Sequence, residues 1–228
     1  MEKHNIHVDI SEAYRYMGGI GTPSDEVASE LQRAALMVEE NVSPRYVIKL
    51  CEIVRNSGIL LKDTNLSFVG KSISALLHDC EQCLIFCATI GSKIETAIRK
   101  WQLKDTTFAA MLDACASSAV ENLCDQIEAE LKIEYSEQEL NLTDRFSPGY
   151  GDLPLSIQPQ FCATLDTQRK IGVVVGEDLM MRPCKSVTAI IGLSKSQQRH
   201  YDLGCKDCEH IKSCKFREKG VTCYGRAI

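Results

Sequence analysis

One long stretch with a single apolar face constrains the fold of this chain more than any other feature. Between residues 106 and 133, apolar side chains recur at the three- and four-residue spacing of an α-helix. At about 1.5 Å per residue, such a helix is roughly 40 Å long, a length that favours a central helix laid across a β-sheet. Its apolar face is marked by Phe108, Met111, Leu112, Cys115, Ala119, Val120, Leu123, Cys124, Ile127 and Leu131.

Shorter patterns on both sides of this helix supply strands and further helices. Strands are expected over 45–55, 58–61, 65–70, 83–91 and 185–194, and the strand over 83–91 is buried because it is apolar on both faces. Helices are expected over 10–17, from Ser24 onward, over 73–79 with Ser72 as the cap, over 92–103 and within 157–172. The predicted fold class is α+β, a single domain with a long central helix packed on a twisted, mainly antiparallel sheet. This domain is expected to cover residues 1–203, with a Cys-rich C-terminal tail over 204–228.

The composition excludes several classes of partner. The formal net charge is −5 and no long basic run occurs, so we expect no nucleic-acid partner. Apolar runs are short and are broken, as at Thr188 and Gly192, so we expect no membrane partner. The N-terminal "MEKHNIHVDIS" carries no apolar signal region, and a cytoplasmic protein is therefore expected.

Twelve cysteines are many for 228 residues, and without a secretory signal they favour buried thiols or metal binding over disulfides. Cys80, Cys83 and Cys87 form a C-x2-C-x3-C cluster, and Cys83 and Cys87 lie in the expected strand over 83–91. On that strand Cys83 and Cys87 share one face with Ile85, because side chains alternate between the two faces. We interpret these three as thiols buried in the core.

The C-terminal tail holds four more cysteines at the spacing C-x2-C-x5-C-x8-C: Cys205, Cys208, Cys214 and Cys223. Nearby lysines favour the thiolate form, and four thiolates satisfy either a tetrahedral zinc ion or a four-iron cluster. The spacing does not distinguish these two metals. His210 is an alternative ligand, and free thiols without metal are the remaining interpretation.

The irregular segment "DRFSPGYGDLPLS" over 144–156 has the composition of a ligand-binding loop. Pro148 and Gly149 suit the centre of a type II turn, and the two glycines let a ligand approach the backbone. Arg145 matches a carboxylate in two parallel hydrogen bonds, and Tyr150 offers an aromatic face to a cation together with a hydroxyl. The loop is thus suited to an amino-acid carboxylate beside a positive sulfur, and a plain connecting turn is the alternative.

At this loop the sequence resembles the activation domain of cobalamin-dependent methionine synthase. The segment "RFSPGYGDLP" is similar to the family's Arg-Pro-Ala-Pro-Gly-Tyr loop, and "MMRPCKSVTAIIGLS" over 180–194 is similar to its Met-x-Pro-x-x-Ser-Val strand. The long helix precedes the loop at a similar distance. The resemblance covers roughly residues 80–203, and the start of the chain looks like the short, free-standing members of the family.

The resemblance implies a module that binds S-adenosylmethionine and supports reductive remethylation of cob(II)alamin. The ligand-binding residues it implies are Arg145 for the carboxylate, Ser147, Pro148 and Gly149 for backbone contact, Tyr150 near the sulfonium, Tyr201 (or its neighbour His200), and Glu121 on the long helix. It implies no general base and no covalent nucleophile. Two departures from the family pattern are Ser156, near the position of a His, and Cys184, at the position of a Gly.

The resemblance also implies partners, because a chain of 228 residues leaves no room for its own cobalamin domain. The cobalamin would be carried by a methionine synthase or another corrinoid protein, and the electron would come from a flavodoxin- or ferredoxin-type donor. The activity would then depend on the partner, as one component of a methyltransferase system. The competing hypothesis is a Cys-rich redox or docking adaptor, with an iron–sulfur cluster or zinc on the tail and no role in methyl transfer.

Overall fold

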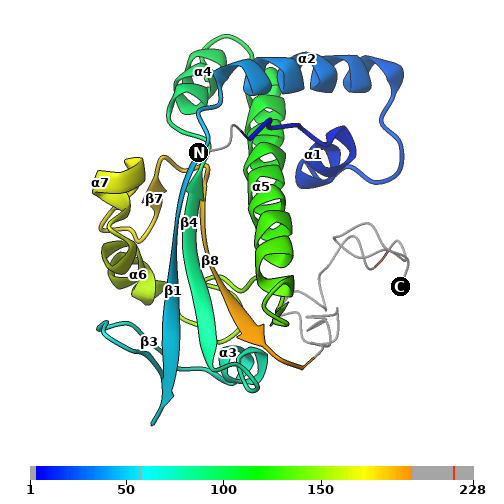
Figure 1. The fold of residues 1–228 in the computed structure, drawn as a ribbon. Coiled ribbons are helices and arrows are strands. Elements are labelled where there is room, and N and C mark those ends of the chain that lie inside the picture. The colour runs from blue at the N-terminus through cyan, green and yellow to red at the C-terminus, as the bar shows by residue number, and fades with distance from the viewer. Residues whose placement is uncertain (1–3, 57, 197–217, 219–228) are drawn as a thin grey trace.

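The computed structural model describes residues 4–56, 58–196 and 218, and these form a layered α+β structure (Figure 1). A six-stranded sheet lies at its centre in the order β3-β2-β1-β4-β8-β5, and every described pairing is antiparallel. The predicted long central helix on a mainly antiparallel sheet is confirmed. The predicted domain boundary at residue 203 lies outside the described residues and stays a prediction.

Three long strands form the middle of the sheet: β1 (Arg45–Arg55), β4 (Gln82–Thr89) and β8 (Ser186–Ser194). The short strands β2 (Ile59–Leu61), β3 (Ser67–Phe68) and β5 (Asn141–Leu142) extend it at the edges. A separate hairpin joins β6 (Val174–Val175) to β7 (Met181–Arg182). Because β4 lies between β1 and β8 along its whole length, it is buried on both faces, as its unbroken apolar sequence predicts.

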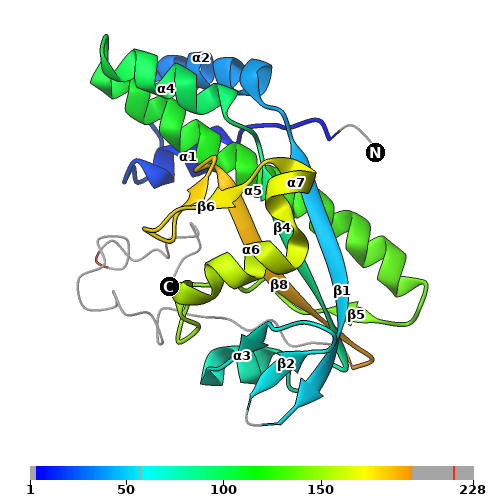
Figure 2. The ribbon, with the colours of Figure 1, turned by 90° about the vertical axis from the view of Figure 1, so that its left-hand side faces the viewer.

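Helices cover both faces of the sheet. The long helix α5 (Thr106–Ser136) lies across one face with α1 (Ile10–Tyr16), α2 (Asp25–Asn41) and α4 (Lys93–Gln102) packed against it. The other face carries α3 (Lys71–Leu76), the 3-10 turn η1 (Leu155–Ile157), α6 (Gln158–Leu165) and α7 (Thr167–Ile171). Figure 2 shows α6 and α7 in front of the sheet and α5 behind it. Within the described residues, no helix is long and apolar enough to cross a bilayer.

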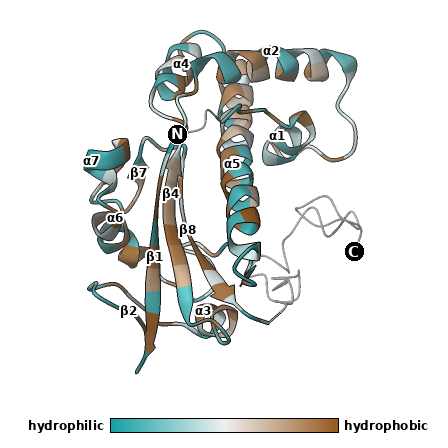
Figure 3. Cartoon of the chain, viewed as in Figure 1, coloured by the Kyte–Doolittle hydropathy of each residue, from teal (hydrophilic) through white to brown (hydrophobic). Residues whose placement is uncertain are grey.

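The alternation of side chains along β4 divides the core in two. Leu84 and Phe86 pack toward α5, whereas Cys83, Ile85 and Cys87 pack toward α3 and α6 on the opposite face. Figure 3 shows the resulting hydrophobic colour along the central strands, against mostly hydrophilic outer faces on the helices. The prediction that Cys80, Cys83 and Cys87 are buried thiols is confirmed.

The start of α5 follows from its sequence. Asp105 has extended backbone, and its carboxylate accepts hydrogen bonds from the amides of Thr107 and Phe108 at 3.0 Å each. This N-cap satisfies amides that have no partner inside the helix. Apolar residues at helical spacing then bury one side of α5 from Phe108 to Tyr135.

The predicted helix over 73–79 is placed wrongly, because α3 begins at Lys71 and ends at Leu76. The N-cap position is Gly70, which has no side chain, and the cap is supplied instead by Asp152, 80 residues after Ser72. Its carboxylate accepts from the amides of Lys71 and Ser72. Ser72 was expected to cap this helix because it lies close in sequence, but the cap is supplied by Asp152 in the loop that follows α5.

Candidate functional site

A cleft of about 620 Å³ lies along the middle of α5. It is lined by Asp113, Ser117 and Glu121, which follow one another at four-residue intervals on α5. The opposite walls are made by Tyr16 and Met17 at the end of α1, by Tyr150, and by Cys184 and Lys185 immediately before β8. The volume falls within the range of about 300–1,000 Å³ that is usual for small-molecule sites.

The loop that carries Tyr150 is tied to the sheet at its beginning. Phe146 forms an isolated bridge to Ile190 of β8, with N–O distances of 3.0 and 2.8 Å in the two directions. The Phe146 ring is buried in the core on the α6 side. Because neighbouring side chains in an extended segment point to opposite faces, Arg145 is directed toward α5.

The predicted turn at Pro148 and Gly149 is present. The amide of Tyr150 donates to the carbonyl of Ser147 at 3.1 Å, and Gly149 has a φ of 92°. A positive φ at the third residue of a closed four-residue turn is the signature of type II, and glycine adopts it without strain. The turn presents Tyr150, which is 57% exposed, at the wall of the cleft.

The second half of the loop is anchored to α3. The hydrogen bonds from the amides of Lys71 and Ser72 hold the pKa of Asp152 below its usual value. Gly151, with a φ of 52°, lies so close to Ser72 that an added Cβ would be 2.9 Å from its Oγ. The segment from Arg145 to Asp152 is thus a built loop, fixed at β8 on one side and at α3 on the other.

Arg145 does not line the cleft directly but lies among carboxylates of α5. Its guanidinium is 2.6 Å from Asp125, 3.2 Å from Glu128 and 3.5 Å from Glu121. The side chain is 21% exposed, and its Nη1 is buried with no hydrogen-bond partner within the described residues. Only Glu121 belongs both to this cluster and to the cleft.

Burial and charge act in opposite directions in this cluster. Burial raises the pKa of Glu121 and outweighs the lowering effect of Arg145. Burial also raises the pKa of the Cys124 thiol, to about 12, against the lowering effect of Arg145. For Arg145 itself, burial lowers the pKa of the guanidinium. The interactions with Cys124 and with the three carboxylates outweigh burial, so the pKa is raised. The guanidinium therefore stays charged, whereas burial disfavours the anionic form of Glu121.

The sequence reasoning missed a second ionic group in the cleft. Lys185 is 2.9 Å from Asp113 and donates to the hydroxyl of Ser117 at 2.8 Å. Next to it, the exposed Cys184 donates its amide to the carboxylate of Glu95 on α4. Both residues belong to the "MMRPCKSV" strand motif, and that motif was the signal that could have identified them.

Tyr16 was missed as well, because nothing in its local sequence marks a site. Its hydroxyl donates to Glu12 at 3.0 Å, and burial together with that carboxylate raises its pKa. Tyr16 adds an uncharged hydroxyl to the cleft, opposite the carboxylates of Asp113 and Glu121 on α5.

The structure thus brings together part of the predicted set. Glu121 and Tyr150 line the cleft, Arg145 contacts Glu121 behind it, and Ser147, Pro148 and Gly149 form the turn that presents Tyr150. Tyr201, His200 and His210 lie outside the described residues, as do Cys205, Cys208, Cys214 and Cys223. In the described part of the chain, no group of three or more His, Cys, Asp or Glu side chains could hold a metal ion.

The fold is similar to that of a solved structure, although the sequence shows little similarity to known proteins. No protein-family model and no curated protein matches the chain. Among solved structures, the chain is similar to the crystal structure of the MetH reactivation domain bound to AdoHcy, with a TM-score of 0.60. The alignment covers 96% of this chain and 86% of that chain, at 14% sequence identity. At that identity the similarity establishes a shared fold.

Proposed function

We propose that this chain is a reactivation module that binds S-adenosylmethionine in the cleft along α5. One observation carries the proposal: two segments that resemble the methionine synthase activation domain line the same cleft. Tyr150 comes from the loop motif and Lys185 from the strand motif, 35 residues further along the chain. The shared fold supports it, since the similar MetH reactivation domain was crystallised with AdoHcy.

The charges of the cleft suit a ligand with a positive sulfur and an amino-acid group. Asp113 and Glu121 are acidic, and Lys185 is already paired with Asp113. The lining charges therefore add up to a slight negative excess, which attracts a ligand of net positive charge. The hydroxyls of Ser117 and Tyr16 and the ring of Tyr150 add hydrogen-bonding groups and an aromatic face.

Arg145 is proposed to bind the ligand carboxylate in exchange for Glu121. Of its three carboxylate contacts, the one to Glu121 is the longest, and it is the one next to the cleft. A ligand carboxylate at this position would take over the contact and would bring a partner to the unsatisfied Nη1. Asp125 and Glu128 would keep the guanidinium oriented during the exchange.

The chemistry of such a module requires alignment more than acid or base. A methyl group passes from the sulfonium sulfur to a cobalt centre on the partner that has been reduced by one electron from its cob(II) state, and the neutral thioether leaves. No proton moves at the reacting atoms. The task of the cleft residues is therefore to bind the amino-acid end, to orient the sulfonium beside Tyr150 and to exclude water. We propose a cobalamin-carrying methionine synthase, or another corrinoid protein, as the partner, with a flavodoxin- or ferredoxin-type electron donor.

Calorimetry with purified protein tests the proposal. We expect saturable binding of S-adenosylmethionine and of S-adenosylhomocysteine, and a loss of about tenfold or more in Arg145→Met, because a charged hydrogen-bond partner is removed. Arg169→Met is the matched control, since Arg169 lies on α7, on the opposite face of the sheet, and pairs with Asp166 just before that helix. Circular dichroism verifies that both variants fold. If neither ligand binds at millimolar concentration, with or without a corrinoid partner, the proposal is wrong.

A protection experiment locates the ligand. Cys184 is the exposed thiol of the cleft, whereas the other seven described thiols are buried. We expect S-adenosylmethionine to slow alkylation at Cys184, measured peptide by peptide with mass spectrometry. Binding without protection of Cys184 would mean that the ligand lies elsewhere.

A further inference from the structure

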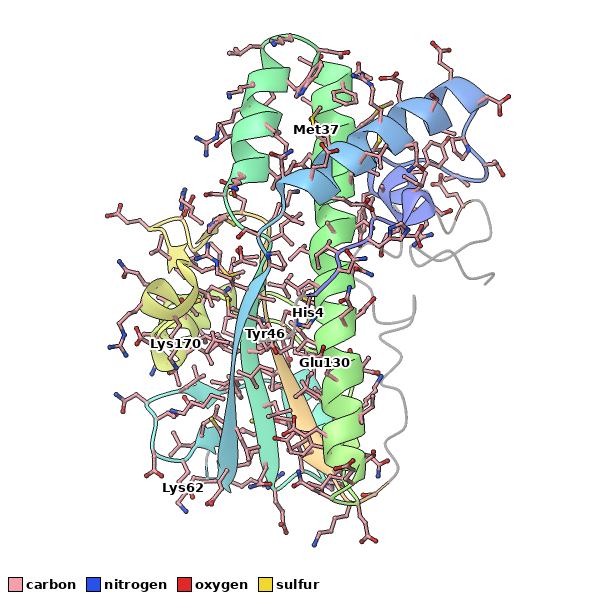
Figure 4. The ribbon with its side chains drawn as sticks, turned by 45° about the horizontal axis from the view of Figure 1, so that its top comes forward. His4, Met37, Tyr46, Lys62, Glu130 and Lys170 are labelled. Carbon is pink, nitrogen blue, oxygen red and sulfur yellow. The ribbon has the colours of Figure 1, made fainter. Side chains whose placement is uncertain are left out.

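A second cavity, of about 380 Å³, lies between the C-terminal end of α2 and the outer face of α4. Its polar and aromatic lining consists of Asn41 from α2 and of Lys93, Thr96, Lys100, Trp101 and Lys104 from α4 and the turn after it. It shares no lining residue with the cleft along α5. Figure 4 shows α2 crossing the upper part of the molecule at Met37, one helical turn before Asn41.

Two of the three lysines, Lys93 and Lys100, lie on an exposed stripe of α4. Ile94 and Ile98 bury the opposite stripe in the core. Lys93 and Lys100 are seven residues apart and therefore lie on the same side of α4, and Lys104 follows in the turn after the helix, which ends at Gln102. Polar side chains of any charge would serve at these exposed positions. The run of three lysines is therefore not explained by the packing of α4.

These three charges are not neutralised by neighbours. Within the described residues, none of the three lysines forms an ion pair, whereas Arg99 on the same helix pairs with Glu95 at 3.6 Å. The chain as a whole carries a net charge of −5, so a cavity with three positive charges departs from its surroundings. Three ammonium groups around one cavity repel one another, and an anion bound between them would offset that repulsion.

Trp101 gives the cavity an aromatic wall. Its ring packs edge-on against Phe108 at a centroid distance of 4.5 Å, and the Lys104 ammonium lies 5.8 Å from its centroid. The amide nitrogen of Asn41 donates to the carbonyl of Met37 at 2.8 Å, which leaves the amide oxygen as an acceptor. Thr96 adds a hydroxyl. The cavity thus combines cations, two neutral hydrogen-bonding groups and the indole ring of Trp101.

We propose that this cavity binds a small phosphate-bearing molecule with a planar ring, of the chemistry of a nucleotide. Lysine ammonium groups bind phosphate oxygens as point charges, and the indole of Trp101 suits a flat ring. The volume is at the lower end of the usual range of about 300–1,000 Å³, which fits one ring with its phosphates rather than a larger cofactor. The site is independent of the S-adenosylmethionine cleft and goes beyond the function proposed for it.

The only tryptophan of the chain is Trp101, so its fluorescence reports directly on this cavity. The probes are ADP, inorganic pyrophosphate and adenosine. We expect ADP to change the Trp101 emission saturably at one molecule per chain. Pyrophosphate should bind more weakly without the ring, and adenosine more weakly still without the charges. Calorimetry under the same conditions gives the stoichiometry.

Charge variants separate a built site from general attraction to lysines. Lys100→Gln and Lys93→Gln should each weaken ADP binding by about tenfold, since each removes a charged phosphate contact. Lys170→Gln, which removes the same charge from α7 on the opposite face of the sheet (Figure 4), should leave it unchanged. Because Lys100→Gln and Lys93→Gln are made separately, the test still works if one of the two variants does not fold.

Three results would overturn this inference. The first is the absence of saturable binding of ADP or pyrophosphate at millimolar concentration. The second is an equal loss of affinity in Lys170→Gln, which would mean that net charge alone attracts the probe. The third is competition between ADP and S-adenosylmethionine in the native protein, which would mean that ADP enters the other cleft. Loss of S-adenosylmethionine binding alone, with ADP binding intact, would contradict the proposed function but not this second site.

Discussion

Asp152 illustrates how one charged residue can hold a loop in the position that a site needs. It lies two residues after Tyr150 and caps α3 by accepting the amides of Lys71 and Ser72. These hydrogen bonds favour the carboxylate, which is why the pKa of Asp152 is lowered. The loop is therefore fixed by a group that is not itself part of the cleft.

The lowered pKa of Asp152 predicts a pH-dependent contribution to stability. Because the folded pKa lies below the usual value of 3.8, the contribution is present above that pH and is lost as the pH falls through the folded value. Asp152→Asn removes the charge, so we expect native protein to be more stable than the variant at pH 6. Urea unfolding at several pH values should show this difference shrinking below pH ~4. Asp63→Asn, on the turn after β2, is the control. A difference that stays constant or grows toward low pH would contradict the prediction.

Among the elements, those with a long unbroken pattern were predictable. The helix expected over 106–133 is Thr106–Ser136, and the strand expected over 83–91 is Gln82–Thr89. The helix is marked by one apolar face and the strand by apolar residues on both faces, and both patterns are visible in the local sequence. The helix that begins after Ser24 was also predicted, and Ser24 caps it. The start of α3 was not, because its cap is supplied from Asp152, far along the chain.

The sequence predicts the turn in the loop of the candidate site, but it does not predict the contacts that other elements make with this loop. The Pro148–Gly149 turn follows from the residues themselves, because their backbone preferences are intrinsic. The carboxylates around Arg145 come from another element, and so does the pairing of Lys185 with Asp113. Such contacts depend on how α5 is laid on the sheet, which periodicity does not specify. Arg145, which the sequence suggests as the partner of a ligand carboxylate, is accordingly paired with carboxylates of α5.

The packing of β8 against the segment that follows α3 gives a prediction at the scale of elements. A Cβ added at Gly192 would lie 2.5 Å from Sγ of Cys80, 2.8 Å from Cδ2 of Leu77 and 2.9 Å from Cγ2 of Thr143. Gly192→Ala should therefore lower the free energy of unfolding by about 1–3 kcal/mol through overpacking. Chemical denaturation measures the loss.

A double variant tests the cause of that loss. In Cys80→Ala/Gly192→Ala the nearest clashing atom is gone, so the total loss should be smaller than the sum of the two single losses. Simple additivity of the two would show that steric conflict with Cys80 is not what makes Gly192 necessary.

At the scale of the whole molecule, the sheet separates two helical layers, and both proposed binding sites lie in the layer of α5. The cleft uses the polar stripe of α5 together with α1 and the start of β8, and the phosphate cavity uses α4 and α2. The helices α6 and α7 on the opposite face contribute to neither lining. Substitutions on α7 therefore serve as controls, because they leave the linings of both proposed sites unchanged.

The two core clusters also bear on the proposed division of the chain at residue 203. In the described part of the chain, every residue of both clusters lies between Ile6 and Leu193. A chain ending at residue 203 should therefore keep the cooperative thermal transition of the full chain to within a few degrees, and its S-adenosylmethionine affinity should fall only by the share that the tail over 204–228 supplies, since Tyr201 is retained. Iron and zinc analysis of both forms, purified without oxygen, then assigns any metal: metal in the full chain alone supports ligation by Cys205, Cys208, Cys214 and Cys223. Loss of the cooperative transition on truncation would mean that the last residues belong to the domain rather than to a separate tail.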